Sequence, residues 1–184
     1  MGYERAVQNA WDNITKAGGL ETSVRMLGVD YDINSMDRTV ITSSSGASAK
    51  DHIKILLLHY LEKKLSGTLP ATSGEWMDFR EIAGATSYYS TFKKRTIDRI
   101  VTKFGDNPGK LFAAAKNLGA EKTSLGDMGL IVSPLEGVPI SLTISRADDE
   151  FPPDGNILFD RSITKIFCTE DIVVLTETLV HTLS

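Results

Sequence analysis

Cysteine, long apolar runs and basic charge are all scarce in this sequence, and each shortage excludes a class of protein. Cys168 is the single cysteine, so the chain alone cannot form an internal disulfide, an iron–sulfur cluster or a thiolate zinc site. The apolar runs 55–58 and 111–115 are far shorter than the ~20 residues that span a bilayer. The net charge of −4 argues against a surface that attracts phosphates. We therefore expect neither a membrane nor a nucleic-acid partner.

Familiar catalytic motifs are also missing. The sequence has no Gly-x-x-x-x-Gly-Lys phosphate loop, no Gly-x-Gly-x-x-Gly dinucleotide fingerprint, no Gly-x-Ser-x-Gly elbow and no His-Glu-x-x-His pair. The sequence therefore does not support the common enzyme classes that depend on these motifs. It leaves open whether the chain is an enzyme.

The overall amino-acid composition is that of an ordinary globular protein. Of 184 residues, 41% are hydrophobic and 24% charged, enough apolar material for one core at a length typical of one domain. We expect a single domain over residues 1–184. The N-terminus has no hydrophobic segment of the kind that a signal peptide needs, and we expect a cytoplasmic protein.

Apolar periodicity predicts a mixture of helices and strands. The predicted helices end at Gly18 and Gly28 or occupy residues 51–65, 92–104 and 108–118, with a last one capped by Thr169. The predicted strands are 29–33, 39–42, 130–132 and 138–144, and residues 156–160 form either a short strand or a docked extended segment. Ser48 is the predicted cap of the central helix. This order favours an α+β fold, with helices packed on a small, mostly antiparallel sheet.

Positive charge gathers beside aromatic residues between positions 88 and 103. Arg95, Arg99 and Lys103 recur every four residues, so one continuous helix would carry them on one face. Arginine binds phosphate or carboxylate through paired hydrogen bonds, and aromatic rings stack on ring-bearing ligands. A solvated helix face is the plainer interpretation. The candidate ligand-binding residues, which include two from the preceding loop, are Trp76, Arg80, Tyr88, Tyr89, Arg95 and Arg99.

Acidic residues gather between positions 148 and 160, where their oxygen atoms would suit a hard cation such as calcium or magnesium. The spacing differs from the calcium-binding loop of EF-hands, because aligning Gly155 with the loop glycine puts Pro152 at a ligand position. A solvated turn stiffened by Pro152-Pro153 is the plainer interpretation. As an alternative site, for a metal ion or for acid–base chemistry, the candidates are Asp149, Glu150, Asp154 and Asp160.

Histidine and cysteine give weaker signals. His52 and His59 lie seven residues apart in the predicted central helix, about 10.5 Å along its axis, which is too far to share one metal ion directly. We interpret each as a core or boundary histidine. Cys168 precedes the last predicted helix, whose N-terminus would lower a thiol pKa, but a buried and inert cysteine is the plainer interpretation.

Several ordered motifs, from about residue 50 onward, resemble the domain of unknown function 3786 family. They lie at 56–61, 75–81, 92–96, 149–153 with 156–160, and 169–171, and the Phe-Pro-Pro to Ile-Leu-Phe-Asp stretch is the most specific. The resemblance implies a setting in corrinoid, one-carbon or redox metabolism of anaerobic bacteria and archaea. Some members are joined to an iron–sulfur-binding module, so this chain, with its lone cysteine, would need an iron–sulfur or corrinoid protein as a partner.

Three functions remain open, and the sequence names no cofactor for any of them. We rank first an accessory or binding protein whose basic and aromatic residues receive an anionic, ring-bearing ligand or partner, because no nucleophile–base or metal constellation stands out. The alternatives are a metal-dependent enzyme that uses the acidic segment and a structural subunit of an assembly.

Overall fold

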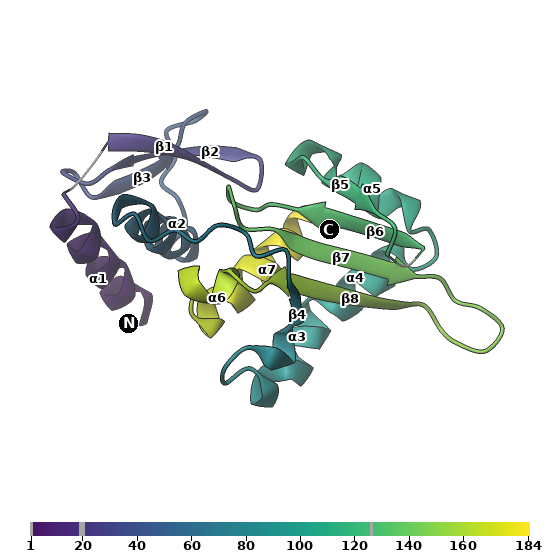
Figure 1. The fold of residues 1–184 in the computed structure, drawn as a ribbon. Helices are drawn as coiled ribbons and strands as arrows, with labels where there is room; N and C mark the ends of the chain where they lie inside the picture. Colours follow the sequence, from purple (N-terminus) through teal and green to yellow (C-terminus); the bar gives the residue numbers. More distant parts are fainter. Residues whose placement is uncertain (1, 19–20, 126) are drawn as a thin grey trace.

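Two antiparallel sheets form the β part of the computed structural model, which describes residues 2–18, 21–125 and 127–184 (Figure 1). The smaller sheet has the order β1-β2-β3 and the larger one the order β4-β8-β7-β6-β5. The strands are β1 (Glu21–Met26), β2 (Val29–Asn34), β3 (Thr39–Thr42), β4 (Trp76–Asp78), β5 (Glu121–Thr123), β6 (Met128–Val132), β7 (Ile140–Ser145) and β8 (Asp154–Asp160). The predicted α+β class is confirmed, with two sheets where one was expected.

Helices join and cover the sheets. In the larger sheet α4 packs on β8 and α5 on β6, while α2 contacts α1, α6 and α7. The α-helices are α1 (Gly2–Lys16), α2 (Asp51–Leu65), α3 (Tyr89–Arg95), α4 (Ile97–Phe104), α5 (Gly109–Ala115), α6 (Ile163–Ile166) and α7 (Thr169–Leu183); the short 3₁₀ helices are η1 (Phe79–Glu81), η2 (Thr86–Tyr88) and η3 (Lys116–Leu118). Among the described residues no helix is both long and apolar enough to cross a membrane.

The core lies between the larger sheet and the helices on one of its faces. Alternate residues of β7, namely Ile140, Leu142 and Ile144, are fully buried, as the period of two along a strand requires when one face is covered. The central helix α2 is buried on several sides, with Leu57 and Leu58 at zero exposure. This explains why its apolar residues extend beyond a single stripe, as expected for a helix that is covered all round.

The prediction of a helix up to Gly28 is wrong over residues 21–26. These residues form β1, which pairs with β2 through the register Met26↔Val29. The turn between the strands has positive φ at both Leu27 (51°) and Gly28 (79°), the conformation of the two-residue hairpin turn that matches strand twist. Residues 19–20 lie outside the described part of the chain.

The prediction of one helix over residues 92–104 is also wrong, because the chain breaks at Thr96 into α3 and α4. Thr96 has φ −124° and ψ −74°, far from helical values. Its buried hydroxyl donates to the Phe92 carbonyl oxygen at 2.7 Å, so the side chain satisfies a backbone acceptor near the break. Arg95 and Arg99 therefore belong to different helices.

Two predicted caps are displaced. α2 begins at Asp51 with Lys50 as its N-cap, two residues after Ser48, and Ser48 instead forms an isolated bridge with Ile41. In α7, Cys168 takes the capping position and Thr169 is the first helical residue.

Candidate functional site

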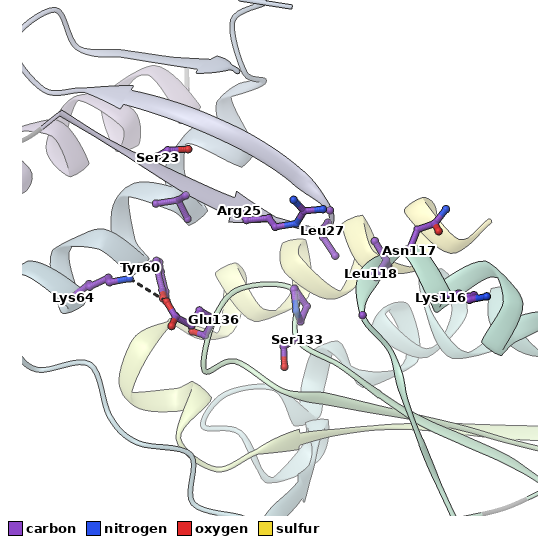
Figure 2. Close-up of a pocket in the computed structure, with 14 residues that line it drawn as sticks. Ser23, Arg25, Leu27, Tyr60, Lys64, Lys116, Asn117, Leu118, Ser133 and Glu136 are labelled. Atoms are coloured by element: carbon purple, nitrogen blue, oxygen red, sulfur yellow. Dashed lines mark hydrogen bonds and ion pairs between the residues drawn. The ribbon is translucent and has the colours of Figure 1, made fainter. Parts of the chain in front are cut away.

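A cleft of about 630 Å³ opens where the smaller sheet meets the rest of the molecule (Figure 2). Its walls come from four segments: the β1–β2 hairpin, α2, the η3 turn and the loop between β6 and β7. The volume is within the range of small-molecule sites in proteins. We refer to it as the inter-sheet cleft.

The hairpin turn closes one end of the inter-sheet cleft by direct contact. The Leu27 N–H donates to the Pro134 carbonyl oxygen at 2.9 Å. A Cβ atom at Gly28 would lie 3.3 Å from Leu118 Cδ2 and 3.5 Å from the Asn117 carbonyl oxygen. Glycine thus permits both the positive φ and the close approach of the hairpin to η3.

The α2 wall is tied to the loop after β6 by Tyr60 and Lys64. The buried Tyr60 hydroxyl donates to the Glu136 carbonyl oxygen at 3.0 Å, and Lys64 Nζ lies 3.1 Å from Glu136 Oε2. Burial raises the pKa of Tyr60, so the phenol stays protonated at neutral pH. The hydrogen bond to Glu136 raises the pKa of Lys64, which therefore keeps its charge.

The charges that line the inter-sheet cleft are mostly positive. Arg25, Lys64 and Lys116 oppose the single carboxylate of Glu136, in a protein whose overall charge is −4. Lys116 makes no ion pair with any residue that the structure describes, whereas Arg25 pairs with Asp30 at 3.2 Å. The apolar lining comes from Val24, Leu27, Leu118 and Pro134. This arrangement suits an anion with an apolar part.

The predicted basic and aromatic residues are divided into smaller groups. Arg95 donates to the Tyr88 hydroxyl at 3.1 Å and pairs with Glu177 at 3.3 Å, and these residues line a hollow of about 470 Å³ together with Glu170. Two carboxylates thus face one guanidinium, so this hollow lacks the excess positive charge that an anion requires.

The remaining members of the predicted set lie elsewhere. Arg80 pairs with Asp78 at 2.8 Å, and its guanidinium lies 4.6 Å from the centre of the Tyr89 ring. Arg99 lines a different hollow, on α4. Trp76 lies on β4 opposite Asp160. The structure therefore pairs Tyr88 with Arg95 and Tyr89 with Arg80, but does not gather all six residues at one site.

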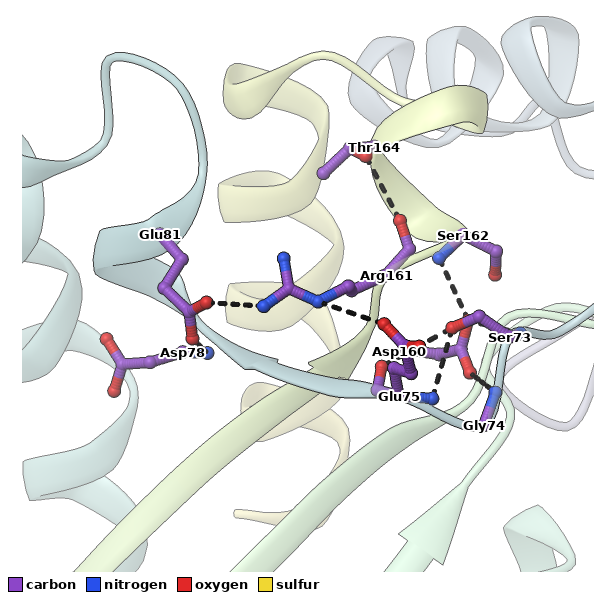
Figure 3. A network of polar contacts seen from close by, with 9 residues as sticks. All are labelled: Ser73, Gly74, Glu75, Asp78, Glu81, Asp160, Arg161, Ser162 and Thr164. Carbon is purple, nitrogen blue, oxygen red and sulfur yellow. Dashed lines mark hydrogen bonds and ion pairs between the residues drawn. The ribbon is translucent and has the colours of Figure 1, made fainter.

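Asp160, one of the predicted metal ligands, is buried and holds the loop before β4 (Figure 3). Its carboxylate accepts hydrogen bonds from the Ser73 N–H and hydroxyl at 2.9 Å each, from the Gly74 N–H at 2.7 Å and from the Ser162 N–H at 2.9 Å. Burial alone would raise the pKa of Asp160, but the hydrogen bonds from Ser162 and Ser73 outweigh it and hold the pKa well below its usual range.

Arg161 extends the same network to β4 and η1. Its side chain lies between Glu75, at 3.5 Å, and Glu81, at 2.7 Å. Glu81 in turn accepts a hydrogen bond from the Asp78 N–H at 2.8 Å, which completes a capping box at η1. The sequence motifs at 75–81 and 156–160 therefore meet in space and support each other.

The other acidic candidates lie apart from this network. Asp149 and Glu150 are exposed in the loop before β8, and Asp154 begins that strand. In this loop Asp148 accepts hydrogen bonds from the Glu150 and Phe151 N–H groups, an arrangement that shapes a turn. Over the described ranges no group of three or more His, Cys, Asp or Glu side chains is arranged to hold a metal ion.

Sequence reasoning missed the residues of the inter-sheet cleft. Arg25, Lys64 and Lys116 come from three elements far apart in the chain, and each is an ordinary surface cation in its own segment. Gly28 was the one usable sequence signal for the cleft, because a glycine lets the backbone of its turn approach another segment closely.

Comparison with known proteins provides a family but no function. Searches of curated proteins and of solved structures found no match. The family model described as Domain of unknown function (DUF3786) matches residues 11–182 of the 184. The match includes both sheets and begins within α1. The chain therefore belongs to the family described as Domain of unknown function (DUF3786), as the resemblance of its motifs predicted.

Proposed function

We propose that this protein binds an anionic small molecule in the inter-sheet cleft. The observation that carries the proposal is the excess of positive charge there, because Arg25, Lys64 and Lys116 meet only two carboxylates, those of Asp30 and Glu136. The low-dielectric walls of a cleft focus the electric field of its charged residues, which raises the local concentration of counter-ions. We retain the anionic ligand expected from the sequence, but we place it in the inter-sheet cleft and not at the predicted surface around Arg95.

The lining suggests how such a ligand would lie. Figure 2 shows Lys64 beside Tyr60 and Glu136 at one end of the cleft and Lys116 beside Asn117 at the other. Either lysine would hold a phosphate or carboxylate group at its own end. Val24 and Leu118 would contact an apolar or ring-bearing part. A molecule that carries a ring and an acidic group satisfies both features.

The test uses anilinonaphthalene sulfonate, a fluorescent anion with aromatic rings, and pyrophosphate as a competitor. We expect Lys116→Gln to weaken binding of the fluorescent anion about tenfold, the effect of losing about 1.4 kcal/mol from one charged hydrogen bond. Lys64→Gln should act at least as strongly, because it also leaves the Glu136 carboxylate uncompensated at the site.

The matched control is Lys110→Gln, which removes an exposed lysine of α5 that does not line the cleft. Unchanged affinity in both cleft variants, with normal folding, would refute the proposal. The double variant Arg95→Ala with Arg99→Ala covers the surface predicted from the sequence. If it alone loses binding, the anion site is on α3 and α4 and not in the cleft.

The iron–sulfur or corrinoid partner implied by the resemblance is an independent proposal. It is tested by a native mass spectrum and an absorption spectrum of the protein purified without oxygen from its own host. A retained cofactor band or partner mass would support it. A bare chain with no partner under these conditions would count against it, without bearing on the cleft.

A further inference from the structure

A second pocket lies between α1, α2 and α7, with a volume of about 400 Å³. It uses a different part of α2 from the inter-sheet cleft and shares no lining residue with it. Its apolar lining comes from Ala6, Ile55, Leu56 and Val174, and its polar lining from His52, His59, Cys168, Glu170 and Asp171. Sequence reasoning treated the two histidines and Cys168 as unrelated core or boundary positions, but the fold brings them together.

A hydrogen-bonded pair of side chains lies in the wall of this pocket. His59 Nδ1 is 2.8 Å from Asp171 Oδ2, and Asp171 is buried in the first turn of α7. A carboxylate accepts the hydrogen bond, so Nδ1 carries the proton and the orientation of the ring is fixed. Asp171 is itself held by the Cys168 N–H, which donates to it at 3.4 Å.

The second ring nitrogen of His59 is left for a ligand. Nε2 has no hydrogen-bond partner within the described part of the chain, and the His59 side chain is 31% exposed where it lines the pocket. The hydrogen bond to Asp171 raises the pKa of His59 and outweighs burial, which lowers it. An imidazolium stabilised in this way donates a hydrogen bond through Nε2.

The neighbouring charges restrict the kind of ligand. The carboxylates of Glu170 and Asp171 line the same pocket, and Glu62 and Lys63 lie close enough to His59 to act on its charge with opposite signs. Burial and the nearby Lys50 lower the pKa of His52, so this histidine adds little positive charge near neutral pH. Two carboxylates disfavour an anion, while the apolar walls favour an uncharged molecule.

We propose that the α2–α7 pocket is a second binding site, for an uncharged molecule with an apolar body and a carbonyl group, and that His59 Nε2 donates a hydrogen bond to that carbonyl oxygen. Asp171 acts as a positioning residue that fixes the imidazole. This site is independent of the inter-sheet cleft, both in its residues and in the charge of its ligand.

Cys168 provides a built-in reporter for this pocket. It lines the pocket and is the only cysteine of the chain, so a thiol reagent modifies one site. Cys168 is exposed, not buried as the sequence suggested, and desolvation together with the Asp171 carboxylate raises the pKa of its thiol although it caps a helix N-terminus. The thiol is therefore mostly protonated at neutral pH, and a reagent held beside it in the pocket reacts faster than one that meets it from solution.

The experiment measures the rate at which N-phenylmaleimide, an uncharged dicarbonyl with an apolar ring, alkylates Cys168. In this reaction the sulfur bonds to one alkene carbon, the carbon–carbon π bond breaks and the other alkene carbon takes up the thiol proton or one from solvent. If the pocket binds the reagent first, the rate saturates with its concentration, and acetophenone, an unreactive carbonyl compound, slows the reaction by competition.

His59→Gln should lower the initial slope of the alkylation rate against N-phenylmaleimide concentration about tenfold, because it removes one charged hydrogen bond. Asp171→Asn removes the carboxylate that raises the pKa of both His59 and the Cys168 thiol, so the pH profile of the rate should move to lower pH. The control is His181→Gln, which changes an exposed histidine near the C-terminus and should leave the rate unchanged.

Two results would overturn the proposal. A rate that rises linearly with N-phenylmaleimide in the unaltered protein, with no protection by acetophenone, would show that the pocket binds no such molecule. Saturation that is identical in a folded His59→Gln variant would show that His59 donates nothing to the ligand. The measurement on the unaltered protein needs no variant and decides the first point even if His59→Gln fails to fold.

Discussion

Asp160 joins three segments of the chain through a single carboxylate. Its partners at Ser73 and Gly74 lie 87 and 86 residues earlier in the sequence, and Ser162 is the N-cap residue of α6. Charge-assisted hydrogen bonds to a buried carboxylate are among the strongest in proteins. This carboxylate is fully used by the fold, which leaves it poorly suited to the metal-binding role considered from the sequence.

Replacing Asp160 with Asn should therefore destabilise the protein strongly. The amide keeps the shape but exchanges an acceptor oxygen for an N–H₂ group that faces backbone donors, and we expect a loss of about 3 kcal/mol in the free energy of unfolding. Urea unfolding at pH 7 measures it. Asp149→Asn, at an exposed position, is the control and should stay within about 0.5 kcal/mol. Equal stabilities for the two variants would contradict the role given to Asp160.

The same carboxylate predicts how stability depends on pH. Because the pKa of Asp160 is lowered in the folded state, the unfolded chain binds a proton first as pH falls. The stabilisation is present above the ordinary aspartate pKa of about 4 and is lost progressively below it. We expect the difference in unfolding free energy between the unaltered protein and Asp160→Asn to shrink from pH 5 to pH 3. A constant difference over this range would be inconsistent with a lowered pKa.

Elements with a strong local pattern could be predicted from the sequence. The helix at 51–65 matches α2 at both ends, because a run of apolar residues followed by Gly67 and Pro70 defines it locally. The hairpin strands 29–33 and 39–42 and the strands of the larger sheet near 130–144 are confirmed for the same reason. Alternation and turn residues are properties of the segment itself.

Elements that depend on distant partners could not be predicted in this way. β1 has only Val24 and Met26 as apolar residues, too few to define a period, and its pairing with β2 over its whole length makes it a strand. The break at Thr96 preserves the helical spacing of apolar residues on both sides, so periodicity alone cannot reveal it. The cleft and the α2–α7 pocket share this property, since their polar residues come from separate elements.

The packing of α4 on β8 predicts the effect of a single methyl group. A Cβ atom at Gly155 would lie 2.8 Å from Val101 Cγ2 and 3.1 Å from the Thr143 carbonyl oxygen. We expect Gly155→Ala to cost about 1–3 kcal/mol in unfolding free energy, because it overpacks the contact between helix and strand. Thermal unfolding of the variant measures it.

Gly109→Ala is the matched control for this contact. Gly109 begins α5, and a Cβ atom there would meet only Asn107 Oδ1, at 3.5 Å. Alanine in an unstrained helical position favours folding by about 0.5–1 kcal/mol. The two alanine variants should therefore shift the melting temperature in opposite directions, and shifts of the same sign would contradict the packing described for β8.

At the scale of the whole molecule, both sheets contribute to one apolar cluster. Ile33 and Val40 of the smaller sheet belong to the same set of buried residues as Leu142 and Phe159 of the larger sheet. The Leu27–Pro134 hydrogen bond and the Tyr60–Glu136 contact add polar links across the inter-sheet cleft. The cleft therefore lies at the surface, above the apolar cluster that the two sheets share, and its shape depends on both sheets being folded.

This shared core predicts that the protein unfolds in one transition, as a single domain does. The two tryptophans allow a direct test, because Trp11 lies buried in α1 and Trp76 lies on β4 of the larger sheet. In Trp76→Phe, fluorescence follows Trp11 alone, and in Trp11→Phe it follows Trp76 alone. Within each variant, the urea midpoint from fluorescence should coincide with that from far-ultraviolet circular dichroism, since coincident probes indicate two-state unfolding. A fluorescence midpoint that precedes the dichroism midpoint in only one variant would show that the two halves unfold separately. In that case the inter-sheet cleft would be a junction between domains, and the affinity of its ligand would depend on how they are held together.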